Sequence, residues 1–177
     1  MIQILVMGVC GVGKSSLAQS IAKRIQARFI EGDDFHSREN IERMKKGEAL
    51  DDMSREPWLD AISLDLKRSV MNSESAVISC SALRQKYRDR IFRYCPNPKV
   101  ISLVGQKHLI RDRLRARIGH FADEKLLDDQ LQILEEPRDR IKIQILRRSS
   151  VDLVTNLTLN ALESEGALPK SKVWRKQ

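Results

Sequence analysis

The residues with the clearest chemical potential form a glycine-rich segment near the amino terminus, Gly8-Val9-Cys10-Gly11-Val12-Gly13-Lys14-Ser15. This segment matches the phosphate-binding pattern GxxxxGK[ST] at every fixed position, directly after an apolar run and directly before a helical pattern. Its glycines allow backbone N–H groups to curl around a phosphate, and the following helix adds its positive end. We therefore expect this loop and Ser16 to bind ATP, with Lys14 as a catalytic contact to the β- and γ-phosphates and Ser15 as a ligand of Mg²⁺.

The loop alone does not decide between several functions. GTPase switches, ATPases and small-molecule kinases share it, and a glycine-rich turn without a ligand is the structural alternative. No Asn-Lys-x-Asp guanine-reading motif is present, and a large ATPase would need a longer chain than 177 residues. These features favour a kinase that transfers the γ-phosphoryl group of ATP to a small acceptor.

A second group of polar side chains follows the second apolar run. In a strand, Glu31 and Asp33 point to the same side, so both carboxylates face the γ-phosphate if that strand lies beside the first one. We expect Glu31 to join the Mg²⁺ shell and Asp33 to orient the acceptor hydroxyl for in-line attack. An acidic turn that caps the next helix is the alternative, and it suits Asp34 or Ser37 better. His36 remains open between a packed residue and a donor to the substrate.

Alternating patterns predict the elements that must hold these side chains. Short β-rich runs are separated by helical patterns, which is typical of a mostly parallel sheet covered by helices on both faces. Ligands of such sheets bind at the carboxyl ends of the strands, where both polar groups fall. We expect an α/β fold with five strands at residues 2–7, 28–31, 75–79, 99–104 and 141–146, and helices at residues 14–26, 37–46, 54–71, 83–92, 107–117, 124–134 and 150–163.

Length and composition fit a single domain over residues 1–177, since 41% hydrophobic residues can fill a core of this size. The three cysteines, Cys10, Cys80 and Cys95, show no zinc spacing, so we expect reduced thiols and a cytoplasmic location. No run predicts a signal sequence or a membrane span.

The net charge of +8 is spread along the chain, so we expect no nucleic-acid partner. The basic residues of the segment at about 166–177 predict a solvated tail. A nucleotide-binding switch or a nucleic-acid module is the alternative from another class of protein. The two Trp and two Tyr residues offer it little surface for base stacking.

Several segments occur together in an order typical of one enzyme family. With the phosphate loop, they resemble the gluconate kinase (gluconokinase) family over about residues 4–137. The segments are Gly32-Asp33-Asp34-Phe35-His36, Asn40-Ile41-Glu42-Arg43-Met44, Gly47-Glu48-Ala49-Leu50-Asp51-Asp52, Arg55-Glu56-Pro57-Trp58-Leu59, Cys80-Ser81-Ala82-Leu83-Arg84-Gln85-Lys86-Tyr87-Arg88-Asp89, Arg117-Ile118-Gly119-His120-Phe121, Leu126-Leu127 and Gln130 through Leu134-Glu135-Glu136-Pro137.

The resemblance implies a P-loop kinase with a nucleoside-monophosphate-kinase-like fold and Mg²⁺ dependence. It implies the transfer of phosphate from ATP to the terminal hydroxyl of D-gluconate, which gives ADP and 6-phospho-D-gluconate. It also leaves a homodimer open. A shikimate-kinase-like or other small-molecule kinase is the alternative, because the phosphate loop, the acidic second strand and an arginine-rich lid are common to these enzymes.

A sugar acid carries a carboxylate and a row of hydroxyls, so its site needs a guanidinium and short polar groups. Arg55 is the candidate for the carboxylate because it precedes Pro57-Trp58, which predicts a stiff helix start. An exposed arginine at a helix start is the alternative. Ser81 and Arg84, which follow the third predicted strand, are further substrate candidates, as is Gln130 of the family-like segment.

Other side chains near the third predicted strand have weaker claims. Cys80 reads as a packed small residue, because phosphoryl transfer needs no covalent catalyst. Lys86 and Arg88 are interpreted as substrate-facing or solvated, and neither is chosen as a site residue.

A basic helix end followed by a glycine predicts a mobile helical lid over about residues 117–134. Arg113, Arg115 and Arg117 precede Gly119. Because they are two residues apart, they point in different directions around a helix, and at most one or two of them face the site. A lid arginine can neutralise charge on the transferring phosphoryl group, and closure keeps water out. We expect Arg117 to have this catalytic role and Arg113 to contact the nucleotide, whereas Arg115 is interpreted as a surface cation.

Overall fold

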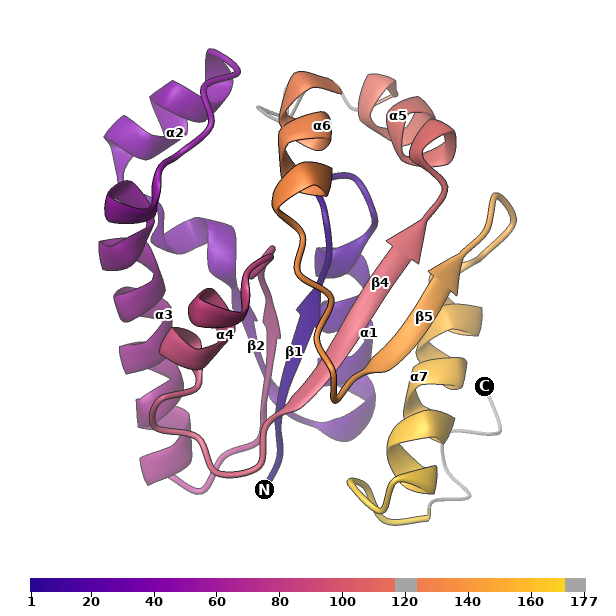
Figure 1. Ribbon diagram of the computed structural model, residues 1–177. Coiled ribbons are helices and arrows are strands. Elements are labelled where there is room, and N and C mark those ends of the chain that lie inside the picture. The colour runs from indigo at the N-terminus through magenta and orange to yellow at the C-terminus, as the bar shows by residue number, and fades with distance from the viewer. Residues whose placement is uncertain (117–123, 171–177) are drawn as a thin grey trace.

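A five-stranded sheet forms the centre of the structure, and all of its neighbouring strands run parallel (Figure 1). The computed structural model describes residues 1–116 and 124–170 of the chain. The strands are β1 (Gln3–Met7), β2 (Arg28–Glu31), β3 (Ala76–Ser79), β4 (Lys99–Gly105) and β5 (Ile141–Ile145), and their order in the sheet is β2-β3-β1-β4-β5. The predicted α/β class and its five strands are confirmed.

The burial of the strands explains why these runs form a sheet. Every residue of β1 and β3 is buried, as expected for central parallel strands with helices on both faces. The edge strand β5 alternates instead, with Ile141, Ile143 and Ile145 buried and the residues between them exposed. Its isoleucines therefore mark the covered face of that edge.

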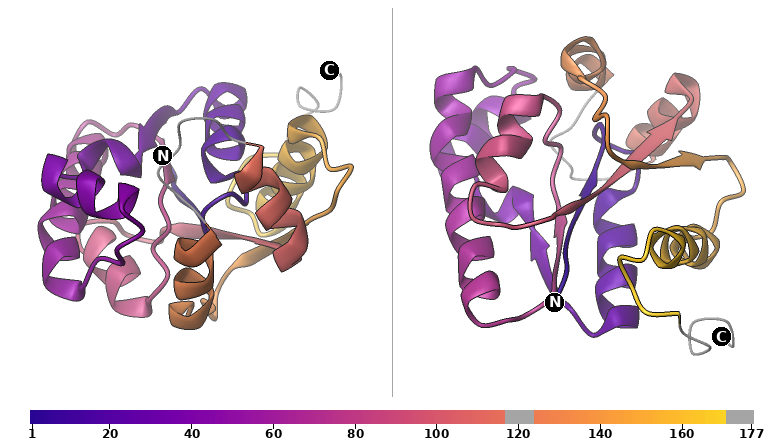
Figure 2. Two further views of the ribbon diagram at one scale, coloured as in Figure 1. Left: turned by 90° about the horizontal axis from the view of Figure 1, so that it is seen from above. Right: turned by 60° about the horizontal axis from the view of Figure 1, so that its bottom comes forward.

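Helices cover both faces of the sheet. They are α1 (Lys14–Ile25), α2 (Arg38–Lys45), α3 (Asp52–Met71), α4 (Gln85–Ile91), α5 (Lys107–Arg115), α6 (Glu124–Ile133) and α7 (Val151–Ser164). α1 and α7 pack on one face and α3 and α4 on the other, while α2, α5 and α6 lie toward the carboxyl ends of the strands (Figures 1 and 2). None of the helices in the described ranges is long and apolar enough to cross a membrane.

The two faces carry separate hydrophobic clusters. Ile4 and Val6 of β1 belong to the cluster beneath α1 and α7, while Leu5 and Met7 of the same strand belong to the cluster beneath α3 and α4. Successive side chains of a strand lie on opposite faces, which produces this division. Leu114 of α5 joins the first cluster and thereby fixes α5 beside the loop that follows β1.

Side-chain caps define where two of the helices begin. Ser37 accepts a backbone hydrogen bond at the start of α2, and Asp51 does the same at the start of α3. Because of the Asp51 cap, α3 begins at Asp52, earlier than predicted, and Pro57 lies inside the helix instead of at its start. Arg55 consequently lies in the first turn of α3, before Pro57.

The position of β2 differs from the one considered for the acidic residues. β3 lies between β2 and β1, so Glu31 pairs in register with Ser79 of β3 and not with a residue of β1. Asp33 lies beyond the strand, in the 3-10 helix η1 (Gly32–Phe35), so strand alternation does not orient it. β2 ends at Glu31, as predicted, so the alternation had been extended two residues beyond the strand. The assumed neighbourhood of β2 and β1 was wrong, because strand order depends on crossovers that no local pattern encodes.

Candidate active site

The loop after β1 has the backbone shape that its glycines predict. Gly8 and Gly13 have φ angles of 143° and 105°, which side chains disfavour. A Cβ atom on Gly8 would lie 2.6 Å from the Leu103 carbonyl oxygen, so a larger residue does not fit there. The Lys14 ammonium donates to the Val9 carbonyl at 3.1 Å and therefore curls back over the loop. Backbone N–H groups, a helix start and an ammonium group thus meet at one place.

Three oxygen-bearing side chains lie beside the start of α1. Ser15 Oγ lies 3.2 Å from Ser79 Oγ at the end of β3. Glu31 is the register partner of Ser79, so both side chains project from the same face of the sheet. Hydroxyl and carboxylate oxygens are hard donors, and Mg²⁺ typically adds one or two protein ligands to water and phosphate oxygens. The donor set suits Mg²⁺ at Ser15 and Glu31, and the described ranges hold no preformed cluster of three His, Cys, Asp or Glu ligands.

The charges of Asp33, Glu31 and Lys14 all act on the buried Cys80 thiol. Burial raises the pKa of the Cys80 thiol to about 12, with the charges of Asp33 and Glu31 also raising it and that of Lys14 lowering it. The three charged groups therefore lie within electrostatic reach of one buried position, directly after β3. Cys80 itself is fully buried, which confirms that it is a packed residue.

The residue that caps the helix after the acidic segment is Ser37. Its hydroxyl caps α2, whereas Asp34 is exposed. Asp33 is half-buried, and its carboxylate forms no hydrogen bond or ion pair with another residue in the described parts of the chain. The Asp33 carboxylate is thus free to accept a hydrogen bond from a ligand.

His36 packs against the first turns of α3. Its ring stacks on Trp58 with the ring centroids 4.1 Å apart, and Trp58 Nε1 donates to the Gly32 carbonyl at 2.6 Å. Burial lowers the pKa of His36 to about 4, while the charge of Asp33 raises it and that of Arg55 lowers it. The imidazole is therefore neutral at pH 7. Its buried Nδ1 has no hydrogen-bond partner among the described residues.

Arg55 and Arg84 border one cavity of about 290 Å³, together with Gln130 of α6. An Arg55 guanidinium N–H donates to the Tyr87 hydroxyl at 3.1 Å, and Arg55 forms no ion pair within the described residues. An Arg84 guanidinium nitrogen lies 3.4 Å from each carboxylate oxygen of Asp52. Arg55 is half-buried in the first turn of α3, so it is not a fully exposed arginine.

A smaller cavity of about 40 Å³ adjoins the first, and Arg55 and Gln130 line both. His36, Ser81 and Tyr87 add further polar groups to its lining. Gln130 also reaches the phosphate loop, because its side-chain oxygen accepts a hydrogen bond from the Cys10 N–H at 2.7 Å. The structure thus brings His36, Arg55, Ser81, Arg84 and Gln130 together beside the loop.

Arg88 has a role that the sequence did not suggest. It is buried, with 2% exposure, and its guanidinium donates to the carbonyls of Ala82 at 2.8 Å and Leu83 at 3.1 Å. Ala82 has a φ of 41°, a left-handed conformation that is costly for a residue with a side chain. Arg88 therefore stabilises the turn that presents Ser81. The interpretation of Arg88 as substrate-facing or solvated was wrong.

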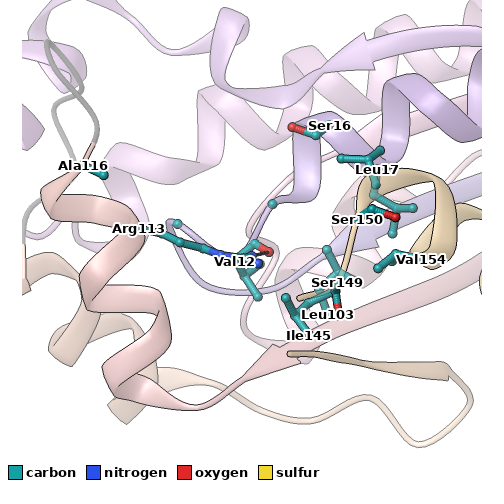
Figure 3. A pocket seen from close by; sticks show the side chains of 13 residues that line it. Val12, Ser16, Leu17, Leu103, Arg113, Ala116, Ile145, Ser149, Ser150 and Val154 are labelled. Atoms are coloured by element: carbon teal, nitrogen blue, oxygen red, sulfur yellow. Dashed lines mark hydrogen bonds between the residues drawn. The ribbon is translucent and has the colours of Figure 1, made fainter. Parts of the chain in front are cut away.

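The opposite side of the loop borders another cavity of about 300 Å³ (Figure 3). Ser16 and Arg113, both predicted nucleotide contacts, line this cavity. An Arg113 guanidinium N–H donates to the Val12 carbonyl at 3.3 Å and joins α5 to the loop. The remaining walls are mostly apolar, and a mixture of apolar walls with a few polar groups suits a small organic ligand such as a nucleotide base. They comprise Gly11, Val12 and Gly13 of the loop together with Leu17, Leu103, Ala116, Ile145, Ser149, Ser150, Val151 and Val154.

Part of the predicted lid lies outside the described residues, and so does its catalytic candidate Arg117. The described part is α6, which is joined to α5 by ion pairs of Asp128 with Lys107 at 2.7 Å and Arg111 at 3.3 Å. The predicted basic tail lies outside the described residues beyond Lys170.

Sequence reasoning missed Asp52, Trp58, Tyr87 and Ser79 as parts of the site. Asp52, Trp58 and Tyr87 lie within the family-like segments, which was the one available signal. Their contacts join separate helices, and no spacing along the chain reveals such pairs.

The sheet order, the GxxxxGKS loop after β1 and the cavities on either side of it define a P-loop kinase. The sequence matches no protein-family model. The thermoresistant gluconokinase of Escherichia coli (strain K12) is 41% identical over 133 residues, which cover 75% of this chain and 76% of the relative.

The gluconokinase of Gluconobacter oxydans (strain 621H) is 37% identical over 136 residues, which cover 77% of this chain and 76% of the relative. A solved gluconokinase structure from Sinorhizobium meliloti 1021 superposes with a TM-score of 0.82 at 35% identity and covers 94% of each chain. The chain belongs to the gluconokinase family.

Proposed function

We propose that the protein transfers the γ-phosphoryl group of ATP to the terminal hydroxyl of D-gluconate, giving 6-phospho-D-gluconate and ADP. The observation that carries the acceptor assignment is the guanidinium of Arg55, which lines the cavity without a carboxylate partner among the described residues. A half-buried charge is stabilised by an opposite charge, and a carboxylate can bind a guanidinium through two parallel hydrogen bonds. A sugar acid supplies that group.

The arrangement of the cavity supports an extended acceptor. Arg55 and Arg84 provide cationic groups, while Gln130 connects the cavity to the phosphate loop through Cys10. Hydroxyls along the sugar chain have Ser81 and the neutral His36 as partners in the adjoining cavity. An acceptor with a carboxylate at one end and a reactive hydroxyl at the other matches this layout.

Asp33 is the proposed group that orients the acceptor hydroxyl and accepts its proton. Its carboxylate has no partner in the described protein and lies near Lys14, in the region of the phosphate loop. The hydroxyl oxygen attacks the γ-phosphorus, the bond from that phosphorus to the bridging oxygen breaks, and ADP leaves. Lys14 and Arg117 are proposed to neutralise the charge on the phosphoryl group during this step.

The loop from Gly8 to Ser16 and Arg113 are proposed to hold the nucleotide, since they border the loop and the cavity beside it. Ser15 and Glu31 would hold Mg²⁺, which neutralises phosphate charge when it is bound. The hydroxyl and carboxylate donors beside the start of α1 support this assignment.

We also propose a cytoplasmic location, which the absence of disulfides among Cys10, Cys80 and Cys95 supports. ATP and gluconate are the proposed partners, with neither a nucleic acid nor a membrane required. A homodimer is part of the proposal on family grounds, and light scattering after size-exclusion chromatography tests it.

The direct test is an ADP-release assay with a panel of sugar acids, neutral sugars and shikimate. We expect gluconate to give the highest kcat/KM and mass spectrometry to detect 6-phosphogluconate. A preference for shikimate or for a neutral sugar would overturn the proposed acceptor. Strong retention on nucleic acid at physiological salt, with no turnover of any acceptor, would favour the binding-module alternative.

A further inference from the structure

Asp52 is the first residue of α3; it lines the larger acceptor-side cavity, and its carboxylate contacts α4 directly. The Tyr87 hydroxyl donates to one of its oxygens at 2.5 Å. The Lys86 ammonium contacts the other oxygen, and Arg84 lies 3.4 Å from both. One carboxylate therefore contacts three side chains at the start of α4.

The Tyr87 hydroxyl connects this carboxylate to Arg55. It donates its proton to Asp52, so its remaining lone pairs accept the 3.1 Å hydrogen bond from the Arg55 guanidinium. Burial and then the Asp52 hydrogen bond raise the pKa of Tyr87, which keeps the phenol protonated. The Arg55 guanidinium also lies over the Tyr87 ring, 5.5 Å from its centroid. Asp52 thus fixes the direction of a hydrogen-bond chain that ends at Arg55.

A second acidic residue of α3 shows what a purely structural contact between the same helices looks like. Asp60 accepts two hydrogen bonds of 2.7 Å from Arg90 of α4, which is a close bidentate pair. Asp52 and Asp60 are similarly exposed, at 40% and 35% of their side-chain surface. Asp60 does not line the cavity that contains Asp52. The looser 3.4 Å contact with Asp52 leaves Arg84 able to bind an incoming anion.

We propose that Asp52 is a positioning residue for the acceptor carboxylate, holding Arg84 directly and Arg55 through the Tyr87 hydroxyl. This inference rests on the proposed function, because it assumes that the two guanidiniums bind a sugar acid. With both guanidiniums fixed at the cavity wall, the carboxylate has a defined position and the far end of the acceptor extends toward Gln130 and the phosphate loop. Asp52 therefore helps to determine which hydroxyl is phosphorylated.

The test compares Asp52→Asn, Tyr87→Phe and the matched control Asp60→Asn in the full-length protein. For each variant, kcat, the KM for gluconate, the KM for ATP and the melting temperature are measured. Asp52→Asn keeps the shape of the side chain but removes the charge. We expect it to raise the KM for gluconate about tenfold, the loss typical of one hydrogen bond to a charged group. The KM for ATP stays unchanged.

Tyr87→Phe keeps the ring beneath Arg55 and removes only the hydroxyl that connects Asp52 to that arginine. We therefore expect a smaller rise in the gluconate KM than for Asp52→Asn. Asp60→Asn lowers the melting temperature comparably to Asp52→Asn but leaves both KM values unchanged. If Asp52→Asn and Asp60→Asn affect the gluconate KM equally, or if neither Asp52→Asn nor Tyr87→Phe changes it, the positioning role is overturned. A wild-type protein that phosphorylates no sugar acid overturns the proposed function itself, and the positioning role with it.

Discussion

The side-chain oxygen of Gln130 accepts a hydrogen bond from the backbone N–H of Cys10 at 2.7 Å. This contact joins α6 to the phosphate loop, and the same side chain lines both cavities on the acceptor side. The ion pairs of Asp128 with α5 hold α6 in this place. Gln130 is consequently the residue at which the proposed acceptor site and the phosphate loop meet.

Gln130→Glu should weaken ATP binding. The carboxylate can still accept from the Cys10 N–H, but it adds a negative charge beside the loop that holds the phosphates. Two unit charges 4 Å apart repel by roughly 4 kcal/mol at an effective dielectric constant of 20. Since water and salt screen part of this, we expect the KM for ATP to rise about tenfold. Gln130→Met, which lacks both charge and acceptor, is the control, and an equal effect of the two variants would exclude repulsion as the cause.

Lys14→Met should abolish turnover and leave the fold intact. Among the described residues, the Lys14 ammonium donates its hydrogen bond to the loop carbonyl of Val9, so its loss removes a phosphate contact without opening the core. The kinase assay and circular dichroism are measured together. Lys23→Met changes an exposed lysine of the same helix and should be fully active. Near-normal activity of Lys14→Met would show that the loop has another role.

Asp33→Asn should lower kcat by about 10²–10⁴-fold, the range typical of a general base. Asparagine keeps the size of the side chain, and the phosphates remain held by the loop, so the KM for ATP should stay constant. The exposed neighbour Asp34 supplies the matched variant, Asp34→Asn, which should keep wild-type kcat. A kcat for Asp33→Asn within about threefold of wild type, far below that range, would remove Asp33 from the reaction.

Arg55→Ala should raise the KM for gluconate far more than the KM for ATP. Removing one partner of a hydrogen-bonded charge pair typically costs about 2–5 kcal/mol. Arg55→Lys should restore little binding, because an ammonium cannot form two parallel hydrogen bonds with a carboxylate. Arg68→Ala, at an exposed position of the same helix, serves as the control. Equal changes in both KM values would indicate a structural role for Arg55.

His36 should make the stability of the fold depend on pH. Burial lowers its pKa from 6.5 in the unfolded chain to about 4 in the folded protein, so the unfolded state binds more protons between these values. Stability is therefore lost as the pH falls through this range and is restored as it rises. His36→Phe keeps the stack on Trp58 but cannot titrate. We expect the melting temperature of the wild type to fall relative to this variant between pH 7 and pH 4.5, and a constant difference would refute the assignment.

Much of the fold follows from patterns within the sequence. The phosphate loop predicts the end of β1 and the start of α1, because its glycines and Lys14 occupy fixed places in the turn. Buried β-rich runs predict the strands to within a residue or two at their ends. The order of β2 and β3 was not predictable, because it depends on how long crossovers pack and not on any local property.

The site was less predictable than the fold for the same reason. Arg55 and Arg84 were identified through their residue type, since guanidiniums suit carboxylates. Asp52 and Tyr87 were missed because their roles depend on a contact between two helices far apart in sequence. Arg88 resembles its solvated neighbours in sequence, and only its burial against the Ala82 turn separates it from them.

The strand order has a consequence for how enzymes of this architecture can diversify. Apart from Gln130 and its neighbours on α6, the polar residues that line the two acceptor-side cavities come from one stretch of the chain, from His36 to Tyr87. Its helices α3 and α4 pack on the face of the sheet opposite α1 and α7, in the other hydrophobic cluster. Mutations on these two helices can accumulate while the walls of the nucleotide cavity stay as they are. Acceptor preference is thus an inheritable module, separable from the machinery that activates the phosphate.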